Sequence, residues 1–480
     1  VGGGSAGGGS AAGGSAGGGS AGGGSAGGGS ADAGPMVPLI GSVLTCGRNG
    51  IVGGLGPGNE LNRHNFGASE FPDALCNDGT AAFFYFRPAS QPASRNRWVI
   101  QLQGGGNCGS GQECAERWCS VNTNFGWQGM SANPAPPQIN ADGILARRVD
   151  NPLGSWNHVF VKYCSSDDWT GTRRDVVVDT VDPLDGGARQ FRMHALGSRI
   201  VDAVLTKLRA DAGSTLVYAA PDGGLTPMPD LDNADIVFLA GASAGGAGTI
   251  SNLDRVRSVL RTHNTSCQGA GCPLVVRGII DSIFAPTLET LDFSTSTLCD
   301  AGLCSYPVFR QWYGAAGPSL LWGEQFDESC VSWHQQHTPD AGYFCNDFGH
   351  VVRNHVTTPF LVRQGLTDVL LSQTILDLRF TVPGKGVMTL PLYAGLVHDQ
   401  LIGLQTLQTT AEEGALIPFE PAAFGPTCAK HETLSDSPNT FLVTIDAGVP
   451  VQMFDVAINW TLDAGRINVV AGSPSENFCP

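Results

Sequence analysis

Ser243 stands in the pattern Gly-x-Ser-x-Gly, which is typical of a nucleophilic serine at a sharp turn between a strand and a helix. Residues 235–240 form a largely apolar run that predicts the strand, and apolar residues recur at helical spacing after the serine. Gly241 and Gly245 provide the small residues that such a turn requires, because a side chain at either position would collide with the strand or the helix. The pattern therefore predicts that Ser243 presents its hydroxyl as the nucleophile of an acyl-transfer reaction.

A second glycine-rich segment is suited to stabilise the charge that this chemistry creates. The apolar run 99–102 predicts a strand, and it leads into Gln-Gly-Gly-Gly-Asn-Cys at residues 103–108. When a serine attacks an ester carbonyl, the oxygen becomes negative and needs N–H donors that already point at it. We expect the main-chain N–H groups of Gly105, Gly106 and Ala244 to form this oxyanion hole, the last of them at the N-terminus of a helix.

A serine nucleophile of this kind needs a histidine base and an acid, and in this arrangement both follow the serine along the chain. Two aspartates come directly after apolar, strand-like runs: Asp368 after residues 359–363, and Asp281 after a run that ends at residue 280. Two late histidines, His398 and His431, lie in loop-like sequence. Spacing alone leaves both choices open.

Several short blocks of the sequence resemble the pectin acetylesterase/Notum carboxylesterase family. They occur in the family's order over about residues 70–480, at 103–108, 163–167, 239–246 with 252–256, 277–282 and 428–432. The resemblance implies an α/β-hydrolase-like fold and a serine carboxylesterase with the triad Ser243, Asp368 and His431. It also implies that Asp281 lies near the site, where we expect it to contact substrate, without being the triad acid.

Asn107 departs from the pattern of this family, whose members usually carry a tryptophan in or just after the glycine-rich loop. A polar side chain there leaves the main-chain donors intact but does not suit a large apolar acyl pocket. We expect Asn107 to contact substrate. An O-acetyl group of a polysaccharide is the first candidate ester, and a long-chain or protein-lipid acyl group, as for Notum, is the alternative.

Strand-like and helix-like segments alternate along the chain, which predicts an α/β fold with a mainly parallel sheet covered by helices on both faces. Strands are expected near residues 99–103, 158–162, 235–240, 274–280 and 359–363, and helices near residues 191–210 and 244–261. We treat residues 35–480 as a single esterase domain. Within it, residues 285–355 hold two cysteine pairs and many aromatic residues, and form either a lid over the site or an ordinary surface insertion.

The chain has 14 cysteines, an even number that favours disulfides and a secreted or extracellular protein. The resemblance implies the pairs Cys76 with Cys164, Cys108 with Cys114, Cys299 with Cys304, Cys330 with Cys345, and Cys428 with Cys479. Local spacing suggests Cys267 with Cys272, which leaves Cys46 and Cys119 as a seventh pair. Because no Cys-x-x-Cys spacing occurs, we predict no metal site and no cofactor.

The net charge of −16, with no cluster of basic residues, argues against nucleic acid and anionic membranes as partners. No apolar run approaches the roughly 18 residues that a membrane-spanning helix needs. The expected partner is an acyl ester, with a carbohydrate as the favoured carrier.

Residues 1–34 form a Gly/Ser/Ala-rich tail, in which residues 2–31 are near-copies of Gly-Gly-Gly-Ser-Ala. Such a segment has almost no apolar surface to bury, so we expect a flexible chain. It could be a spacer to the cell surface, an engineered tag, or a segment through which residues 1–31 assemble a homo-oligomer or filament. The last case leaves open a structural protein that retains an esterase fold.

Overall fold

The computed structural model describes residues 36–46, 57–121, 126–133, 135–209, 217–219, 225–269, 271–315, 318–404, 421–435, 443–446, 449–453 and 468–471. The glycine-rich tail lies outside these residues, so its expected behaviour stays a prediction.

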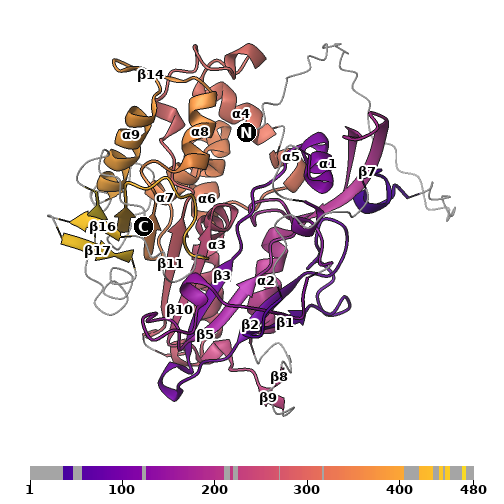
Figure 1. The fold of residues 1–480 in the computed structure, drawn as a ribbon, viewed down its shortest axis with the longest axis vertical. Coiled ribbons are helices and arrows are strands. Elements are labelled where there is room, and N and C mark those ends of the chain that lie inside the picture. The colour runs from indigo at the N-terminus through magenta and orange to yellow at the C-terminus, as the bar shows by residue number, and fades with distance from the viewer. Residues whose placement is uncertain are drawn as a thin grey trace.

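Within the described residues, a ten-stranded sheet forms the centre of the molecule (Figure 1). Its order is β18-β15-β12-β11-β10-β3-β5-β2-β1-β4, and neighbouring strands from β18 to β5 run parallel, whereas β2, β1 and β4 pair antiparallel. The strands are β1 (Leu61–Asn65), β2 (Phe83–Arg87), β3 (Arg97–Leu102), β4 (Gln138–Ile139), β5 (Asn157–Val161), β10 (Ile236–Ala242), β11 (Val275–Asp281), β12 (Phe360–Arg363), β15 (Ala422–Gly425) and β18 (Asn468–Val470). The predicted α/β fold is confirmed, and the five expected strands correspond to β3, β5, β10, β11 and β12.

The central strands are buried because helices cover the sheet. Helix α3 (Ala244–His263) packs against β10, β11 and β3, and buries Leu253, Val256 and Leu260. Helix α9 (Leu390–Gly403) packs against β15 and β18. Helix α2 (Gly197–Lys207) buries Ile200, Val201 and Val204 in the same core.

The helix expected over residues 191–210 is wrong in its first part. Ala188–Ala195 is strand β7, which pairs with β6 (Arg173–Val181) in an antiparallel hairpin, and α2 begins only after it. Phe191, Met193 and Ala195 alternate along the strand and are buried, which is the period of two that a strand imposes. Figure 1 shows this hairpin beside α1 (Gly111–Cys119), away from the sheet. Two further hairpins join β8 (Val217–Ala219) to β9 (Leu225–Pro227), and β16 (Val443–Asp446) to β17 (Val449–Gln452).

The predicted insertion at residues 285–355 is helical. It holds α4 (Tyr306–Ala315), α5 (Pro318–Trp322), α6 (Glu328–His337) and α7 (Phe348–Asn354), which lie in the upper half of Figure 1 with α8 (Val369–Asp377). Aromatic rings pack the insertion together: Phe293 contacts Tyr306 and Phe309, and Tyr306 contacts Phe344. Whether it acts as a lid stays a prediction. A small ribbon of β13 (Thr381–Val382) and β14 (Gly386–Val387) follows α8.

Disulfides join cysteines of the described residues in the pairs that the sequence suggested. They are Cys46 with Cys119, Cys76 with Cys164, Cys108 with Cys114, Cys267 with Cys272, Cys299 with Cys304, and Cys330 with Cys345. Cys428 is also disulfide-bonded, and its expected partner Cys479 lies outside the described residues. In the part of the chain that the structure describes, no helix is long and apolar enough to cross a membrane.

Candidate active site

Ser243 is the residue between strand β10 and helix α3, and its backbone has φ 55° and ψ −123°. A non-glycine residue with positive φ is strained, and here the strain comes from reversing the chain within one residue. The flanking glycines make this possible. A Cβ at Gly241 would lie 2.0 Å from the main-chain oxygen of Gly245, and a Cβ at Gly245 would lie 2.1 Å from that of Leu102. No larger residue fits either position without moving the backbone.

The glycine-rich loop after β3 lies directly against this turn. A Cβ at Gly104 would be 2.6 Å from the main-chain oxygen of Ala242 and 3.4 Å from Cβ of Ser243. Gly105 and Gly106 have φ of 141° and 60°, in the region that favours glycine. Ala244 begins α3, where the first N–H groups of a helix have no partner within the helix. The three expected oxyanion donors thus come from segments that meet at Ser243.

Asp368 and His431 are brought together from positions 63 residues apart. Nδ1 of His431 lies 2.9 Å from both Oδ1 and Oδ2 of Asp368. The carboxylate is fully buried, and it also accepts hydrogen bonds from the main-chain N–H groups of Leu370 and Leu371 and from Nε2 of Gln364. Asp368 is therefore also the N-cap of α8. Because Nδ1 faces the carboxylate, Nε2 of His431 is the nitrogen left to act as a base.

The pKa of His431 is raised above its ordinary value of 6.5. Burial opposes protonation, but the hydrogen bond to Asp368 and the negative charges of Asp368, Asp281 and Glu432 outweigh it. This environment stabilises the imidazolium that forms when a histidine accepts a proton from serine.

His398, the other late histidine, lies on α9, and its ring contacts the side chain of its neighbour Asp399 at 3.1 Å. It makes no hydrogen bond to Asp368 or Asp281 among those of the described residues. Of the two open choices, the geometry pairs Asp368 with His431.

Asp281 lies beside the turn at Ser243, near the site as the resemblance implied. Its side chain is fully buried and forms an ion pair with Arg363, Oδ1 to Nη1 at 2.9 Å, while Oδ2 accepts the N–H groups of Thr433 and Leu434. Its main-chain oxygen accepts the N–H of Ser243 at 2.9 Å. The carboxylate has no exposed surface, and it links the turn at Ser243 to the loop that holds Thr433 and Leu434. Its contact with substrate stays a prediction.

The sequence reasoning missed Arg363, which completes this arrangement. Nη1 of Arg363 donates to Asp281 Oδ1, to Ser282 Oγ and to the main-chain oxygen of His431, each at 2.9 Å. The guanidinium is fully buried at the end of β12. The signal in the sequence was an arginine at the end of the otherwise apolar run 359–363.

Asn107 is exposed, and its Nδ2 donates to Oδ2 of Asp168 at 2.6 Å. Burial raises the pKa of the Asp168 carboxyl to about 7, against the effect of this hydrogen bond. Asn107 thus stands at the outer side of the glycine-rich loop with its amide fixed by a buried carboxyl. Contact with substrate stays a prediction.

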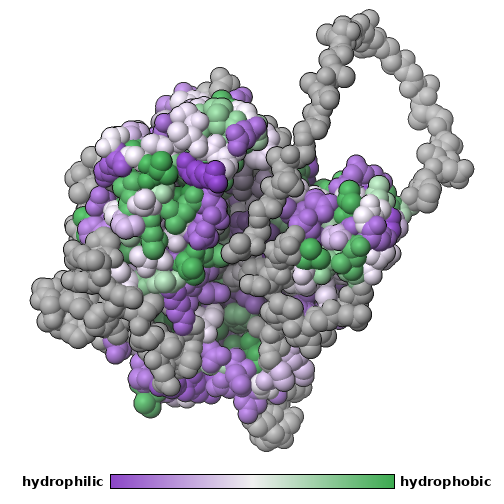
Figure 2. All heavy atoms as spheres, turned by 45° about the horizontal axis from the view of Figure 1, so that its top comes forward, coloured by the Kyte–Doolittle hydropathy of each residue, from purple (hydrophilic) through white to green (hydrophobic). Residues whose placement is uncertain are grey.

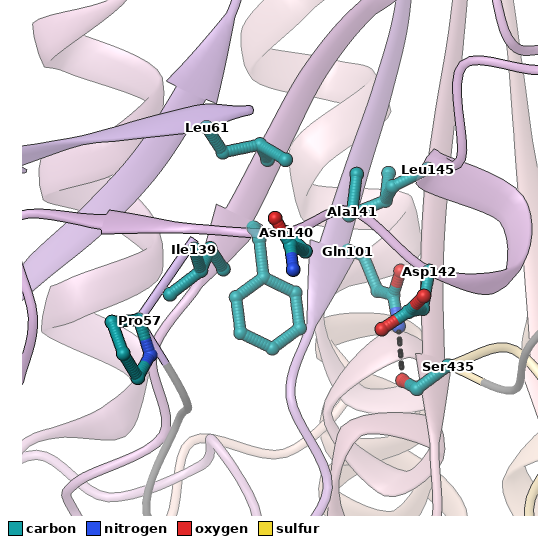
Figure 3. Close-up of a pocket in the computed structure, with 10 residues that line it drawn as sticks. Pro57, Leu61, Gln101, Ile139, Asn140, Ala141, Asp142, Leu145 and Ser435 are labelled. Atoms are coloured by element: carbon teal, nitrogen blue, oxygen red, sulfur yellow. Dashed lines mark hydrogen bonds between the residues drawn. The ribbon is translucent and has the colours of Figure 1, made fainter. Parts of the chain in front are cut away.

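A cavity of about 290 Å³ is lined by residues of β1, β3, β4 and β5 and by Ser435, and it contains none of the three candidate catalytic residues (Figure 3). Leu61, Ile139 and Phe160 form its apolar wall. On the other side, Nε2 of Gln101 donates to Oγ of Ser435 at 2.9 Å. Among the described residues, the one group of side chains close enough to share a metal ion is in the helical insertion and includes no residue of the candidate active site.

Comparison with known proteins shows what this chain is similar to. The family model described as Pectinacetylesterase matches residues 66–271, which include the glycine-rich loop and Ser243. Palmitoleoyl-protein carboxylesterase NOTUM of Drosophila melanogaster is 28% identical over 364 residues, which are 75% of this chain and 43% of that protein. The human protein of the same name is 25% identical over 368 residues, 75% of this chain and 59% of that protein. The notum2 protein of Xenopus laevis is 34% identical over 230 residues, 47% of this chain and 39% of that protein.

The chain spans about half the length of the curated relatives that it matches. Among solved structures, that of the Wnt deacylase Notum from Drosophila superposes with a TM-score of 0.57 at 23% identity, covering 88% of this chain and all of that one (100%). This likeness supports the fold. The family model and the curated relatives together show that this chain is similar to proteins of the pectin acetylesterase/Notum family.

Proposed function

We propose that this protein hydrolyses O-acyl esters through an acyl-enzyme on Ser243. The observation that carries the proposal is the hydrogen bond between Asp368 and Nδ1 of His431, which leaves Nε2 free of the carboxylate and able to act as the general base. The loop that follows His431 is also linked to the turn at Ser243, because Asp281 accepts the N–H groups of both Ser243 and Thr433. Nε2 takes the proton of Ser243 Oγ as that oxygen attacks the carbonyl carbon of the ester. The N–H groups of Gly105, Gly106 and Ala244 then stabilise the oxyanion.

The second half of the reaction repeats these roles. The protonated His431 gives its proton to the leaving alcohol, and the ester bond breaks to leave the acyl group on Ser243. A water molecule, deprotonated by His431, attacks the acyl-enzyme, and the carboxylic acid is released. No group beyond these side chains, main-chain donors and water is needed to balance the reaction.

For the acyl group, we propose an O-acetyl ester of a polysaccharide as the first candidate. The matching family model is described as Pectinacetylesterase. In addition, the polar side chain of Asn107, on the outer side of the glycine-rich loop, suits a carbohydrate better than an acyl chain.

A long-chain acyl ester is the second candidate, and two observations favour it. The curated relatives are named palmitoleoyl-protein carboxylesterases. Val369 and Leu370, which directly follow Asp368, are 59% and 51% exposed, and Val387 and Leu390 are exposed as well. Figure 2 shows hydrophobic side chains gathered on the upper left of the view, over the part of the molecule where Figure 1 places α8 and α9.

One experiment separates these candidates and tests the mechanism. Hydrolysis of a series of acyl esters from acetyl to palmitoyl should show a maximum at one end of the series. Ser243→Ala should lower kcat/KM by about 10³-fold or more for every ester. Ser251→Ala, at a serine of α3 whose hydroxyl donates to the main-chain oxygen of Ala247 in the same helix, should leave kcat/KM unchanged. Full activity in Ser243→Ala would refute the proposal.

We also propose that the protein works in an oxidising, extracellular setting, because disulfides tie together many of its loops. For residues 1–31, a spacer to a surface, an assembly segment and an engineered tag all remain open.

A further inference from the structure

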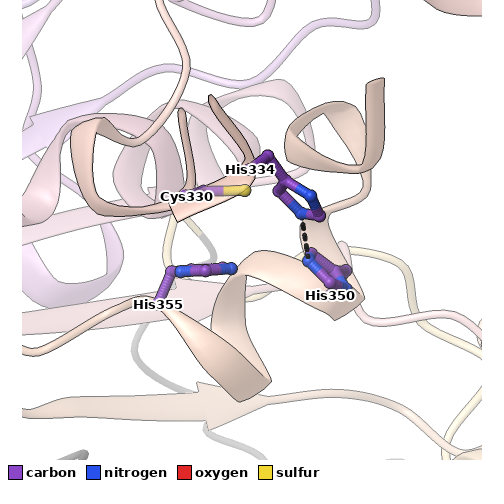
Figure 4. A group of neighbouring side chains, drawn as sticks. All are labelled: Cys330, His334, His350 and His355. Atoms are coloured by element: carbon purple, nitrogen blue, oxygen red, sulfur yellow. Dashed lines mark hydrogen bonds between the residues drawn. The ribbon is translucent and has the colours of Figure 1, made fainter. Parts of the chain in front are cut away.

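Three buried histidines converge between helices α6 and α7, in the insertion between β11 and β12 (Figure 4). His334 comes from α6, His350 from α7, and His355 directly follows α7. Their exposed fractions are 1%, 9% and 1%. One ring nitrogen of each, together with Sγ of Cys330, lies within 4.8 Å of the others. The candidate active site uses none of these residues.

The distances fit ligands that share one ion. Nε2 of His334 and Nε2 of His350 are 3.3 Å apart, and they share a hydrogen bond. Two nitrogens at about 2.0–2.1 Å from a tetrahedral zinc ion are separated by about 3.3–3.4 Å, so the pair already has the spacing of two zinc ligands. The centroids of the three rings are 5.4, 6.1 and 5.3 Å apart, which places the rings around a common centre.

The surroundings also suit a metal site. Nδ1 of His334 lies 2.7 Å from Oγ1 of Thr338, and a hydrogen bond donated by Nδ1–H to this hydroxyl leaves Nε2 as the ligand atom. Phe344 stacks against the rings of His334 and His350 and fixes their orientation.

Cys330 is not available as a thiolate, because it forms a disulfide with Cys345. The ligand set in the oxidised chain is therefore three imidazoles, with the fourth position left to water or another small ligand. Imidazole ligands in tetrahedral geometry favour zinc among the common biological metals.

We propose that His334, His350 and His355 bind one divalent transition-metal ion of the zinc class, which fixes α6 to α7. Short-range spacing such as Cys-x-x-Cys does not reveal this site, because its ligands are separated by 16 and 5 positions and meet only in the fold. The inference does not depend on the proposed function.

The test uses the full chain with its disulfides intact. After incubation with Zn²⁺ and removal of loosely bound ion, elemental analysis should find about one zinc per chain. Co²⁺ in place of Zn²⁺ should give the visible absorption bands of a four-coordinate ion. His350→Ala and His355→Ala should each weaken Zn²⁺ binding by at least about tenfold. His337→Ala is the matched control, since this histidine lies exposed on the same helix, and it should bind as the unaltered chain does.

The cysteines provide a second, independent variant. Replacing both Cys330 and Cys345 by serine should retain zinc, because the sulfur is not a ligand. Loss of zinc from this variant while its circular dichroism is unchanged would contradict the three-histidine site. Failure of the unaltered chain to bind Zn²⁺ or Co²⁺ beyond the level of nonspecific binding would overturn the proposal. It would also be overturned if His350→Ala and His355→Ala bound Zn²⁺ as tightly as the unaltered chain.

Discussion

Replacing Asp368 by asparagine tests the assignment of the acid with little change in shape. The side-chain oxygen of asparagine can still accept the N–H groups of Leu370 and Leu371, and asparagine is a good N-cap, so α8 should keep its start. The new NH₂ group, however, faces Nδ1 of His431, where the carboxylate accepted a hydrogen bond. The imidazole must then accept at Nδ1 and carry its proton on Nε2.

A protonated Nε2 cannot take the proton of Ser243, so the loss should be large. The equivalent tautomer change in Ser-His-Asp hydrolases lowers kcat by about 10⁴-fold, and we expect a loss of about 10³- to 10⁴-fold here. The pH profile should also move. In the unaltered protein the raised pKa of His431 means that activity is gained as pH rises through a value above 6.5. Without the charge of Asp368, burial dominates and the pKa falls, so the remaining activity of the variant should persist to lower pH.

The assay is kcat/KM for a short acyl ester between pH 5 and 9, with urea unfolding measured on the same samples. Asp368→Ala is the companion variant: it should lose similar activity and, because it also removes the cap, about 0.5–2 kcal/mol of stability that Asp368→Asn keeps. The reasoning would be refuted if the activity of Asp368→Asn were within tenfold of that of the unaltered protein. It would also be refuted if the two proteins lost activity at the same pH on acidification.

Three further predictions concern other parts of the site. Gly245→Ala should abolish activity and cost about 1–3 kcal/mol of stability in urea unfolding, because its Cβ meets a main-chain oxygen at 2.1 Å; Gly395→Ala, in open space on α9, should do neither. His431→Ala should lose about 10³-fold or more in ester hydrolysis, whereas His398→Ala should keep most of it, and the reverse result would move the base. Deleting residues 1–31 should leave turnover per chain unchanged; light scattering then decides between spacer and assembly segment, since only the latter predicts smaller particles on deletion.

The parts of the site that follow directly from local sequence could be predicted well. The turn at Ser243 and the glycine-rich loop each depend on a few adjacent residues, in which an apolar strand ends at glycines that no side chain could replace. The boundary near residue 195 could not be placed, because the alternating strand β7 runs into α2 with one residue between them. Over such a short stretch, the spacing of apolar residues in a strand, every second residue, cannot be told from their spacing in a helix, every 3.6 residues.

The choice between His398 and His431 could not be made from spacing, because it depends on contacts made across the fold. His431 lies in a loop after β15, and its distance from Asp368 is set by the parallel pairing of β12 with β15. Both strands end at the same edge of the sheet, which brings the two loops together. The resemblance to the family favoured His431, and the pairing of β12 with β15 explains why the loop that holds it lies beside Asp368.

The ion pair of Asp281 and Arg363 shows why a buried charge is hard to interpret from sequence. Placing two charges in the interior costs about as much desolvation as their attraction returns, so the pair is weak evidence of stabilisation. Its hydrogen bonds suggest a different reason for its presence. Asp281 accepts the N–H of Ser243 with its main chain and the N–H groups of Thr433 and Leu434 with its carboxylate, and Arg363 holds the main-chain oxygen of His431. An apolar pair of the same size could fill the space, but it could not fix the serine turn and the histidine loop in one orientation. We therefore interpret the two charges as positioning groups for the proposed catalytic residues Ser243 and His431.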